Sequence, residues 1–409
     1  MRILLVEPAY YTMYPPLGLL KLGKLEERAW NEVELVRGTV EPRTEPDKIY
    51  ITSLFTFTWK PVHDAIAYYH ARFPAAEIHV GGIYATLMPH HIAAAFPYVR
   101  LHSGLVWEAE DVLPAYHLLQ QVERWKDWNK SILFTTRGCI RKCPFCVVPK
   151  MEGGMKQTRK SILPLIHTDH DEVVIWDNDF LASPYARDVL CELRDGGYRV
   201  DFNQGLDARL MTEDFAGILA DLRMPTVHMA YDWPWEGPFI KKAIGFMGDA
   251  GYRTKNLIFY VLHNFYDFQY RKGDTPVDFL RRLQDLMLWR ASAYPMRFIP
   301  LDSLSRSGFV SPLWSAEELE MIAEARRVLG VRGTFVYFDA LAGKFQGSRT
   351  LAEAMGLRPP GGEPPAKRSP RSLQRSTALP PIPVLPVLPN VARSDYCPSR
   401  EHSRPPILR

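Results

Sequence analysis

The sequence contains 409 residues, of which 46% are hydrophobic and 23% charged, as is ordinary for globular proteins. The formal net charge is +4, and it comes from residues 357–409, which hold nine Arg or Lys and three Asp or Glu. The rest of the chain therefore carries a net charge of about minus two. The sequence accordingly shows no clear signature of nucleic-acid binding. No apolar run reaches the roughly 20 residues of a membrane span, and the N-terminus enters a strand pattern without a signal peptide, so we expect a cytoplasmic protein.

Strands and helices alternate over residues 1–125. The predicted strands are 3–6, 34–36, 49–55 and 77–80, and the predicted helices run from residue 17 to about 29 and from 61 to 73. Such alternation is typical of a parallel sheet with helices on both faces. We therefore expect an α/β domain with a doubly wound sheet, followed by a linker near residues 107–129.

Three of the five cysteines, Cys139, Cys143 and Cys146, follow the apolar strand pattern 132–134 with the spacing CxxxCxxC. Cysteine thiolates hold soft metal centres, including iron–sulfur clusters. Because a 4Fe-4S cube has four irons, three local ligands would leave one iron open to a small molecule.

Zinc and a disulfide are the alternatives for these cysteines. Cys143 and Cys146 form a CxxC pair, and His167 and His170 follow, but the gap and the short His-x-x-His fall outside the usual zinc-finger spacing. A disulfide would leave one cysteine over, in a chain without signs of secretion.

The strand pattern 132–134, which precedes the cysteines, begins a second series of alternating strands and helices. Further strands are predicted at 172–176, 199–202, 226–231, 257–262 and 296–299, with helices at 185–195, 212–222, 276–289 and 315–329. Six strands with intervening helices favour a partial (βα)6 barrel over residues 126–340. In such barrels, functional side chains gather at the C-terminal ends of the strands.

Polar residues follow nearly every one of these strands. They include Asp177 and Asp179, Asn203, Gln204 and Arg209, then Asp232, His263 with Asn264, and Arg297. Each set could be a turn or a helix cap, since Asp and Asn favour such positions. Their recurrence at one barrel edge predicts a site there.

Residues 357–409 are rich in Pro, Arg and Ser. This composition favours polyproline II or disorder, so we expect a disordered tail. Cys397 lies in this tail and Cys191 on a predicted helix, so neither is expected to ligate a cluster.

The loop from Cys139 to Cys146, with Phe145 before its last cysteine, resembles the signature of the radical S-adenosylmethionine (radical SAM) enzymes. The resemblance implies that the three cysteines hold a 4Fe-4S cluster, that the amino and carboxylate groups of S-adenosyl-L-methionine (SAM) chelate the fourth iron, and that Phe145 lies beside the adenine. It further implies reductive cleavage of SAM to a 5'-deoxyadenosyl radical, with the electron delivered by a reductant protein such as a flavodoxin or ferredoxin.

The first domain resembles the cobalamin-binding-type domain that precedes the barrel in one group of this family. The resemblance rests on residues 14–19, Tyr-Pro-Pro-Leu-Gly-Leu, and on Gly81-Gly82. No Asp-x-His-x-x-Gly segment follows the first strand, so the cobalt-ligating histidine of the best-known sites is missing. The sequence leaves open whether cobalamin binds. Bound cobalamin would favour a methylation reaction.

The resemblance also suggests roles at the strand ends. The ammonium of SAM needs an acceptor, for which Asp177 or Asp179 is suited, and its carboxylate and ribose need partners such as Asn203, Gln204 and Arg209. The alternative for Arg209 is an ion pair with Asp207 or Glu213.

Two other function classes remain beside the enzyme. One is an iron–sulfur electron-transfer or sensory protein, and the other is a degenerate binding module without SAM turnover. The substrate is not indicated by the sequence, because one barrel can serve many reactions.

Overall fold

The computed structural model describes residues 1–356, of which 1–355 form one compact unit. Its first part is a sheet of five parallel strands in the order β2-β1-β3-β4-β5. The strands are β1 (Arg2–Glu7), β2 (Glu32–Arg37), β3 (Lys48–Ser53), β4 (Glu77–Gly82) and β5 (Arg100–Leu101). β1 is buried along almost its whole length, because both faces of this sheet are covered.

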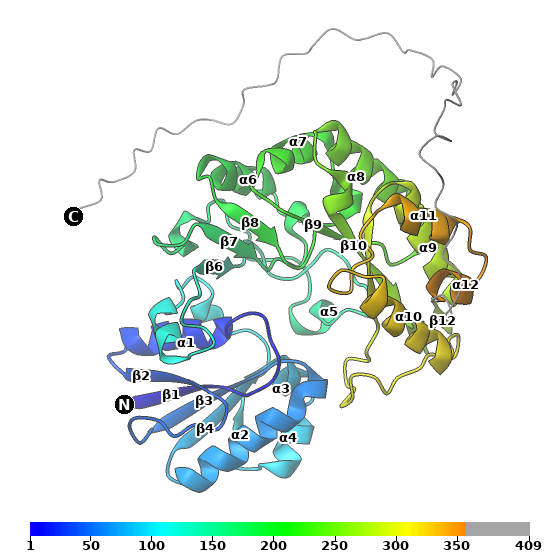
Figure 1. Cartoon of the computed structure of the whole chain (residues 1–409). Coiled ribbons are helices and arrows are strands. Elements are labelled where there is room, and N and C mark those ends of the chain that lie inside the picture. Colours follow the sequence, from blue (N-terminus) through cyan, green and yellow to red (C-terminus); the bar gives the residue numbers. More distant parts are fainter. Residues whose placement is uncertain (357–409) are drawn as a thin grey trace, which may run out of the picture. The chain divides into compact units, whose positions relative to one another are not determined.

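Helices cover the two faces of this sheet, as expected for a doubly wound fold (Figure 1). One face packs against α1 (Leu17–Arg28), which contributes Leu19 and Leu20 to a core with Ile3 and Leu5. The other face packs against helices that follow β3 and β4. These are α2 (Trp59–Arg72), α3 (Ile83–Leu87) and α4 (Pro89–Ala95).

The segment expected to be a linker belongs to the first core. Residues 116–121 form a 3-10 helix, and Tyr116, Leu119 and Trp125 pack onto the α1 face of the sheet. The apolar side chains of this segment are therefore part of the buried core. The division of the compact unit near residue 125 stays a proposal.

Six parallel strands form the second part. They are β6 (Lys130–Leu133), β7 (Glu172–Ile175), β8 (Arg199–Phe202), β9 (Val227–Ala230), β10 (Leu257–His263) and β13 (Ser292–Arg297). They pair as β6-β7-β8 and β9-β10-β13, and a parallel bridge between Leu206 and Met229 joins the two halves. The expected partial barrel is confirmed.

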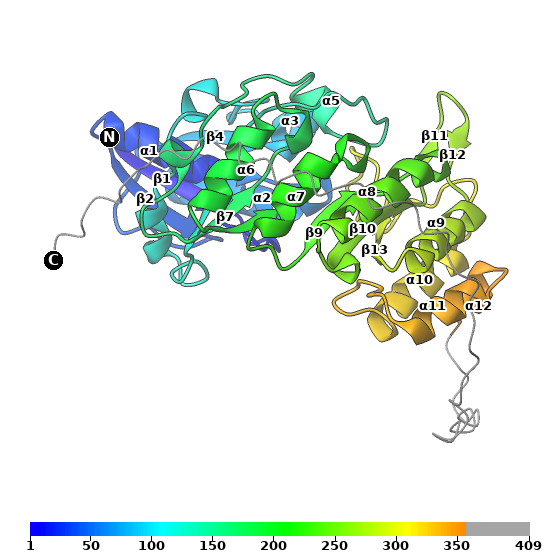
Figure 2. The same ribbon diagram turned by 90° about the horizontal axis from the view of Figure 1, so that it is seen from above.

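Four helices follow one another along the barrel strands (Figures 1 and 2). They are α6 (Ala186–Asp195), α7 (Glu213–Asp221), α8 (Gly237–Asp249) and α9 (Pro276–Leu288), of which α8 was not among the predicted helices. A short helix, α5 (Val148–Met151), follows the cysteines, and an antiparallel ribbon of β11 (Tyr266–Asp267) and β12 (Lys272–Gly273) follows β10.

The sixth barrel strand was misplaced by the sequence analysis, which put it at 296–299. It runs from Ser292 to Arg297 and contains Pro295. The strand is at the end of its sheet, where the missing N–H of a proline is tolerated. The proline concealed the true start of the strand.

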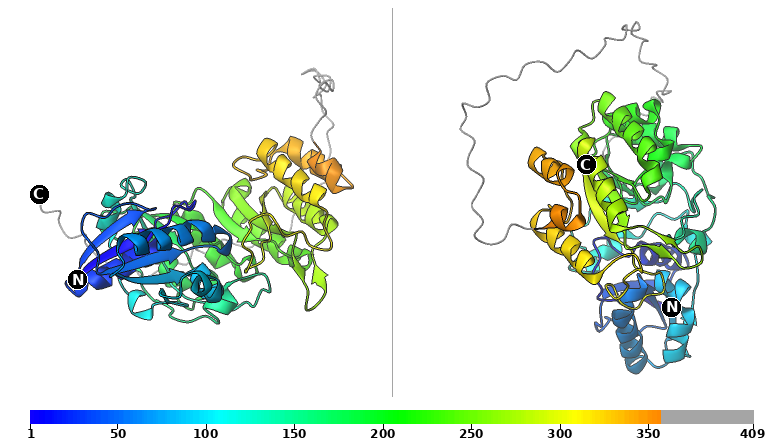
Figure 3. Two further views of the ribbon diagram at one scale, coloured as in Figure 1. Left: turned by 90° about the horizontal axis from the view of Figure 1, so that it is seen from below. Right: turned by 90° about the vertical axis from the view of Figure 1, so that its right-hand side faces the viewer.

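Three helices follow the barrel. They are α10 (Ala316–Val328), α11 (Asp339–Gln346) and α12 (Leu351–Met355), which gather beside α9 (Figures 1 and 3). α10 begins at a capping box of Ser315 and Glu318, as predicted. The predicted disordered tail, residues 357–409, lies outside the described residues. Within residues 1–356, the structure has no helix with the length and apolar character needed to cross a membrane.

Candidate functional site

The cysteine loop leaves the end of β6 and is fixed by backbone hydrogen bonds. Arg137 exchanges two of them with Lys156, at 2.9 and 2.8 Å, and the Cys139 amide donates to the Gly153 carbonyl at 3.2 Å. Gly138 has a φ of +77°, and a side chain there would put its Cβ 2.2 Å from the Gly154 carbonyl oxygen. The loop therefore needs glycine immediately before its first cysteine.

The thiols of Cys139, Cys143 and Cys146 are partly buried and line one cavity of about 1130 Å³. Burial raises the pKa of Cys139 to about 12 and that of Cys143 to about 11. The Arg141 amide donates to the Cys139 sulfur at 3.2 Å, which favours the thiolate that metal binding requires. Within residues 1–356, no three His, Cys, Asp or Glu side chains lie close enough together to hold a single metal ion.

The cavity is bounded by the C-terminal strand ends of both sheets. From the predicted barrel site it is lined by Phe145, Asp179, Asn203, Gln204 and Arg209. From the first sheet and α1 it is lined by, among others, Tyr14, Gly18, Lys21, Tyr50, Gly81, Gly82 and His102. In parallel α/β folds this edge is where ligands bind.

The structure separates the two aspartates that the sequence left as alternatives. Asp177 is 2% exposed and does not line the cavity. Its carboxylate accepts hydrogen bonds from the Thr135 amide at 2.6 Å, from the Thr135 hydroxyl, and from the Thr136 hydroxyl at 3.0 Å. Asp177 therefore ties β7 to the start of the cysteine loop.

Asp179 lies on the cavity wall beside the first cysteine. The Cys139 thiol donates to Asp179 Oδ2 at 3.4 Å. The other oxygen, Oδ1, is buried and has no hydrogen-bond partner among the described residues. Burial is the main cause that raises the pKa of Asp179. A buried carboxylate oxygen without a donor fits a ligand that supplies one.

Asn203 and Gln204 follow β8 and meet a residue that precedes α1. The Asn203 side-chain amide donates to the Tyr14 hydroxyl at 2.6 Å, and Gln204 donates to Asn203 Oδ1 at 3.3 Å. Tyr14 belongs to the proline-rich segment before α1, so this segment touches the barrel directly.

The Arg209 guanidinium is hydrogen-bonded to two carboxylates. Its Nε and Nη2 donate to the two oxygens of Asp207 at 2.7 and 2.9 Å, and its Nη1 donates to Glu236 at 3.1 Å. Asp207 is one of the two pairing alternatives considered from the sequence. Glu236 was missed, because it lies 27 residues from Arg209 in the Trp-Pro-Trp-Glu segment after β9.

The remaining strand-end residues fall into two groups. Asp232 lines the cavity, and burial raises its pKa to about 7. Asn264 instead donates to the Phe309 carbonyl at 3.0 Å, and it accepts from the Ser311 amide at 2.8 Å. His263 and Arg297 do not line the cavity, and neither does His228, which lies within β9. Phe145 lies on the wall against Phe265 and Trp233, with ring centroids 5.5 and 6.5 Å away.

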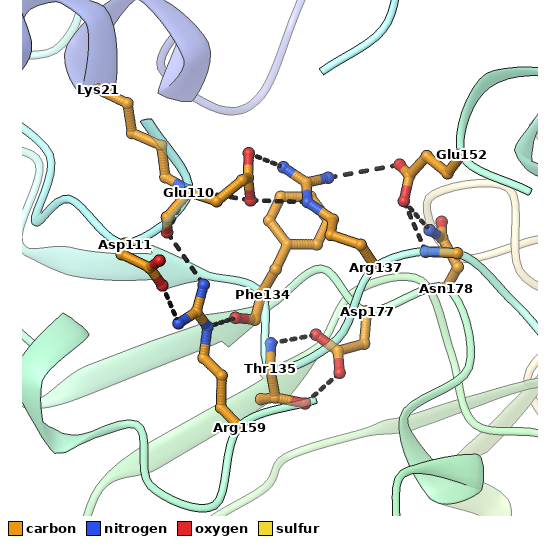
Figure 4. Close-up of polar contacts among 11 residues, drawn as sticks. Lys21, Glu110, Asp111, Phe134, Thr135, Arg137, Glu152, Arg159, Asp177 and Asn178 are labelled. Atoms are coloured by element: carbon orange, nitrogen blue, oxygen red, sulfur yellow. Dashed lines mark hydrogen bonds and ion pairs between the residues drawn. The ribbon is translucent and has the colours of Figure 1, made fainter. Parts of the chain in front are cut away.

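A charged cluster joins α1 to the cysteine loop (Figure 4). Glu110 accepts two hydrogen bonds from Arg137, at 2.8 and 2.7 Å, and one from Lys21 at 3.4 Å. Glu152 accepts from the Gly138 amide at 2.8 Å and from Asn178 at 3.1 Å. The sequence analysis missed this cluster, since nothing in the local pattern around Glu110 separates it from a surface loop residue.

The comparisons with known proteins identify a fold. No family model matches the chain, and no curated protein matches it. The structure is similar to that of TsrM from Kitasatospora setae, described as a radical S-adenosylmethionine methyltransferase with cobalamin and a [4Fe-4S] cluster bound. The TM-score is 0.50 at 14% identity, and the match covers 86% of this chain and 80% of that chain.

A second similar structure is coproporphyrinogen III oxidase (HemN) from Escherichia coli, described as a radical SAM enzyme. Its TM-score is 0.35 at 14% identity, covering 57% of this chain and 61% of that chain. The likeness to TsrM shows that the chain shares the fold of that radical SAM methyltransferase, as the sequence resemblance implied.

Proposed function

Starting from this fold, we propose that the chain is a radical SAM enzyme whose cluster is held by Cys139, Cys143 and Cys146. The observation that carries the proposal is the placement of the three thiols and the unpartnered Asp179 oxygen on one cavity at the strand ends. When bound, a reduced [4Fe-4S] cluster and SAM supply reductive cleavage to a 5'-deoxyadenosyl radical.

The protein's own part is to bind, orient and shield the reactants. Asp179 Oδ1 is the proposed acceptor for the SAM ammonium, since it is buried beside Cys139 and lacks a donor within the described residues. Asn203 and Gln204 are proposed to contact the ribose and carboxylate, and Phe145 to contact the adenine. Arg209, already bound to Asp207 and Glu236, is proposed to order this wall of the cavity.

Cobalamin is the proposed second cofactor of the same cavity. Gly81 and Gly82 line this cavity at the end of β4, and the φ of +104° at Gly82 requires glycine there. The similar structure TsrM is described with cobalamin bound. With cobalamin, methylation of a substrate is the favoured reaction, and without it, hydrogen abstraction from an unidentified substrate.

The electron-transfer alternative would require a fourth ligand for the cluster. Cys191 lies on α6 and does not line the cavity, so in the part of the chain that the structure describes it is not positioned to be this fourth ligand. We further propose that a flavodoxin or ferredoxin supplies the electron and that the protein works in the reducing cytoplasm.

The cluster assignment is tested by anaerobic reconstitution with iron and sulfide. Replacing Cys139, Cys143 and Cys146 together by Ala is expected to abolish bound iron and the visible absorption. Cys191→Ala, a cysteine variant outside the cavity, serves as the control and should bind iron like the wild type. A triple variant that retained its iron would show that the ligands lie elsewhere.

A further inference from the structure

Glu110 is almost completely buried, with 5% of its surface exposed, although it lies in a loop between the two sheets. A buried carboxylate is costly unless it is paired and hydrogen-bonded. Glu110 is held by the guanidinium of Arg137 through two parallel hydrogen bonds of 2.8 and 2.7 Å, the strongest geometry for such a pair. Hydrogen bonding to Arg137 and the charges of Arg137 and Lys21 keep the pKa of Glu110 low despite its burial.

Arg137 connects the buried Glu110 carboxylate to the loop that carries the cysteines. It precedes Cys139 by two residues, and its backbone pairs with Lys156 in both directions. Its guanidinium also lies over the Phe134 ring, 3.4 Å from the centroid, and donates to Glu152 at 3.4 Å. The guanidinium therefore contacts Glu110, Glu152 and the Phe134 ring at once.

Glu152 holds the cysteine loop from its C-terminal end. It follows the last cysteine by six residues, and one of its oxygens accepts from the Gly138 amide at 2.8 Å. The same oxygen accepts from Asn178, which stands directly before the cavity residue Asp179. One carboxylate thus touches the cysteine loop and the end of β7 together.

On its other side Glu110 meets α1. Lys21, also 5% exposed, donates to the Glu110 carbonyl at 3.3 Å and to its carboxylate at 3.4 Å. Lys21, Glu110, Arg137 and Glu152 all line the cavity. Figure 4 shows the polar contacts among them. The cluster forms a wall that runs from α1 to the cysteines.

We propose that Glu110 is a positioning residue for the reaction, holding the cysteine loop through Arg137 and joining it to the α1 side of the cavity. This inference rests on the proposed function of the three cysteines. Glu110 acts through Arg137, in the manner of outer residues that orient the ligands of a metal site and change its affinity or activity about tenfold to a hundredfold when replaced.

The test compares Glu110→Gln with Glu7→Gln in reconstituted protein. Glu7 is likewise buried and paired with an arginine, Arg37 at 3.3 Å, but it does not line the cavity. Bound iron, the reduction potential of the cluster and its electron paramagnetic resonance (EPR) spectrum with SAM are measured. Glu110→Gln should shift the potential and the SAM-dependent spectrum and slow SAM cleavage about tenfold or more, whereas Glu7→Gln should match the wild type.

Arg137→Lys provides a second variant that keeps the charge but loses the two-pronged hydrogen bonds. It should shift the potential in the same direction as Glu110→Gln. A folded Glu110→Gln protein that lost its iron would also support the proposal. Wild-type potential and spectrum in both variants would overturn it, while a wild-type protein without cluster or cleavage would instead overturn the proposed function.

Discussion

The Cys139 thiol and the Asp179 carboxylate are in hydrogen-bond contact at 3.4 Å, which puts an acidic group beside the first proposed cluster ligand. The second oxygen of Asp179 has no partner among the described residues. A proposed cluster ligand and a free acceptor therefore share one corner of the cavity. An acceptor of this kind is what the ammonium of SAM needs next to an open iron.

Replacing Asp179 by Asn tests this pairing. Because a hydrogen bond to a charged group contributes about 1.5–3 kcal/mol, SAM should bind about tenfold to a hundredfold more weakly. The cluster itself should stay bound, since the cysteines are unchanged. The dissociation constant is obtained by following the EPR spectrum of the reduced cluster during a SAM titration, and unchanged affinity would contradict the role of Asp179.

The neighbouring Asp177 is expected to act on stability instead. Asp177→Ala would leave the buried donors of Thr135 and Thr136 without an acceptor, at a cost of about 1–3 kcal/mol for each such group. Urea unfolding of the apo protein measures the loss. Asp169→Ala, at a strongly exposed aspartate, should change the unfolding free energy by less than about 0.5 kcal/mol. Equal midpoints for both variants would argue against the structural role of Asp177.

Gly138 is expected to be essential for the cysteine loop. Gly138→Ala would force a Cβ to within 2.2 Å of the Gly154 carbonyl oxygen, so the loop must shift. Reconstituted Gly138→Ala should therefore bind clearly less iron than the wild type. Gly197 shares the positive φ, at +65°, but has open space around it, so Gly197→Ala should lose only about 1–2 kcal/mol of stability and keep its iron. Full iron content in Gly138→Ala would contradict this account of the loop.

The buried Lys21 is expected to make the unfolding free energy of the protein depend on pH. Burial lowers its pKa to about 8, against the effect of Glu110 and together with that of Arg137 and Arg159. Below pH 8 the lysine is charged in both the folded and the unfolded chain, and the folded chain bears the cost of the buried charge. Above pH 8 the folded chain loses the proton before the unfolded one, so stability rises until about pH 10.4.

Lys21→Met removes this cost. At pH 7 the variant should be more stable than the wild type by up to about 3 kcal/mol, and the difference should shrink at pH 9.5. Urea unfolding of the apo proteins at the two pH values measures both differences. A variant that is less stable at pH 7, or a difference that does not depend on pH, would contradict the charged, buried lysine.

The sequence predicted those parts of the fold that depend on local patterns. Hydrophobic periodicity located most strands of both sheets to within a few residues. It missed the two-residue edge strand β5 and misplaced β13, where Pro295 hid the start of the strand. The cysteine spacing and the polar strand ends likewise pointed to one edge of the barrel. These features are encoded over short distances along the chain.

The rest of the site depends on contacts between distant residues. Asp177 and Asp179 differ by two positions, and only the turn after β7 decides that one meets Thr135 and the other faces the cavity. Glu110 meets Arg137 across 27 residues, and Tyr14 meets Asn203 across 189. No local pattern indicates such pairs, because they form only when the two sheets pack within the compact unit.

The central claim is tested most directly by the yield of 5'-deoxyadenosine. Anaerobically reconstituted protein is incubated with dithionite and SAM, and the products are separated by chromatography. The account predicts 5'-deoxyadenosine from the wild type and none from the variant in which Cys139, Cys143 and Cys146 are replaced by Ala. Equal yields from the two proteins, or an intact cluster that cleaves no SAM in either the absence or presence of cobalamin, would contradict it.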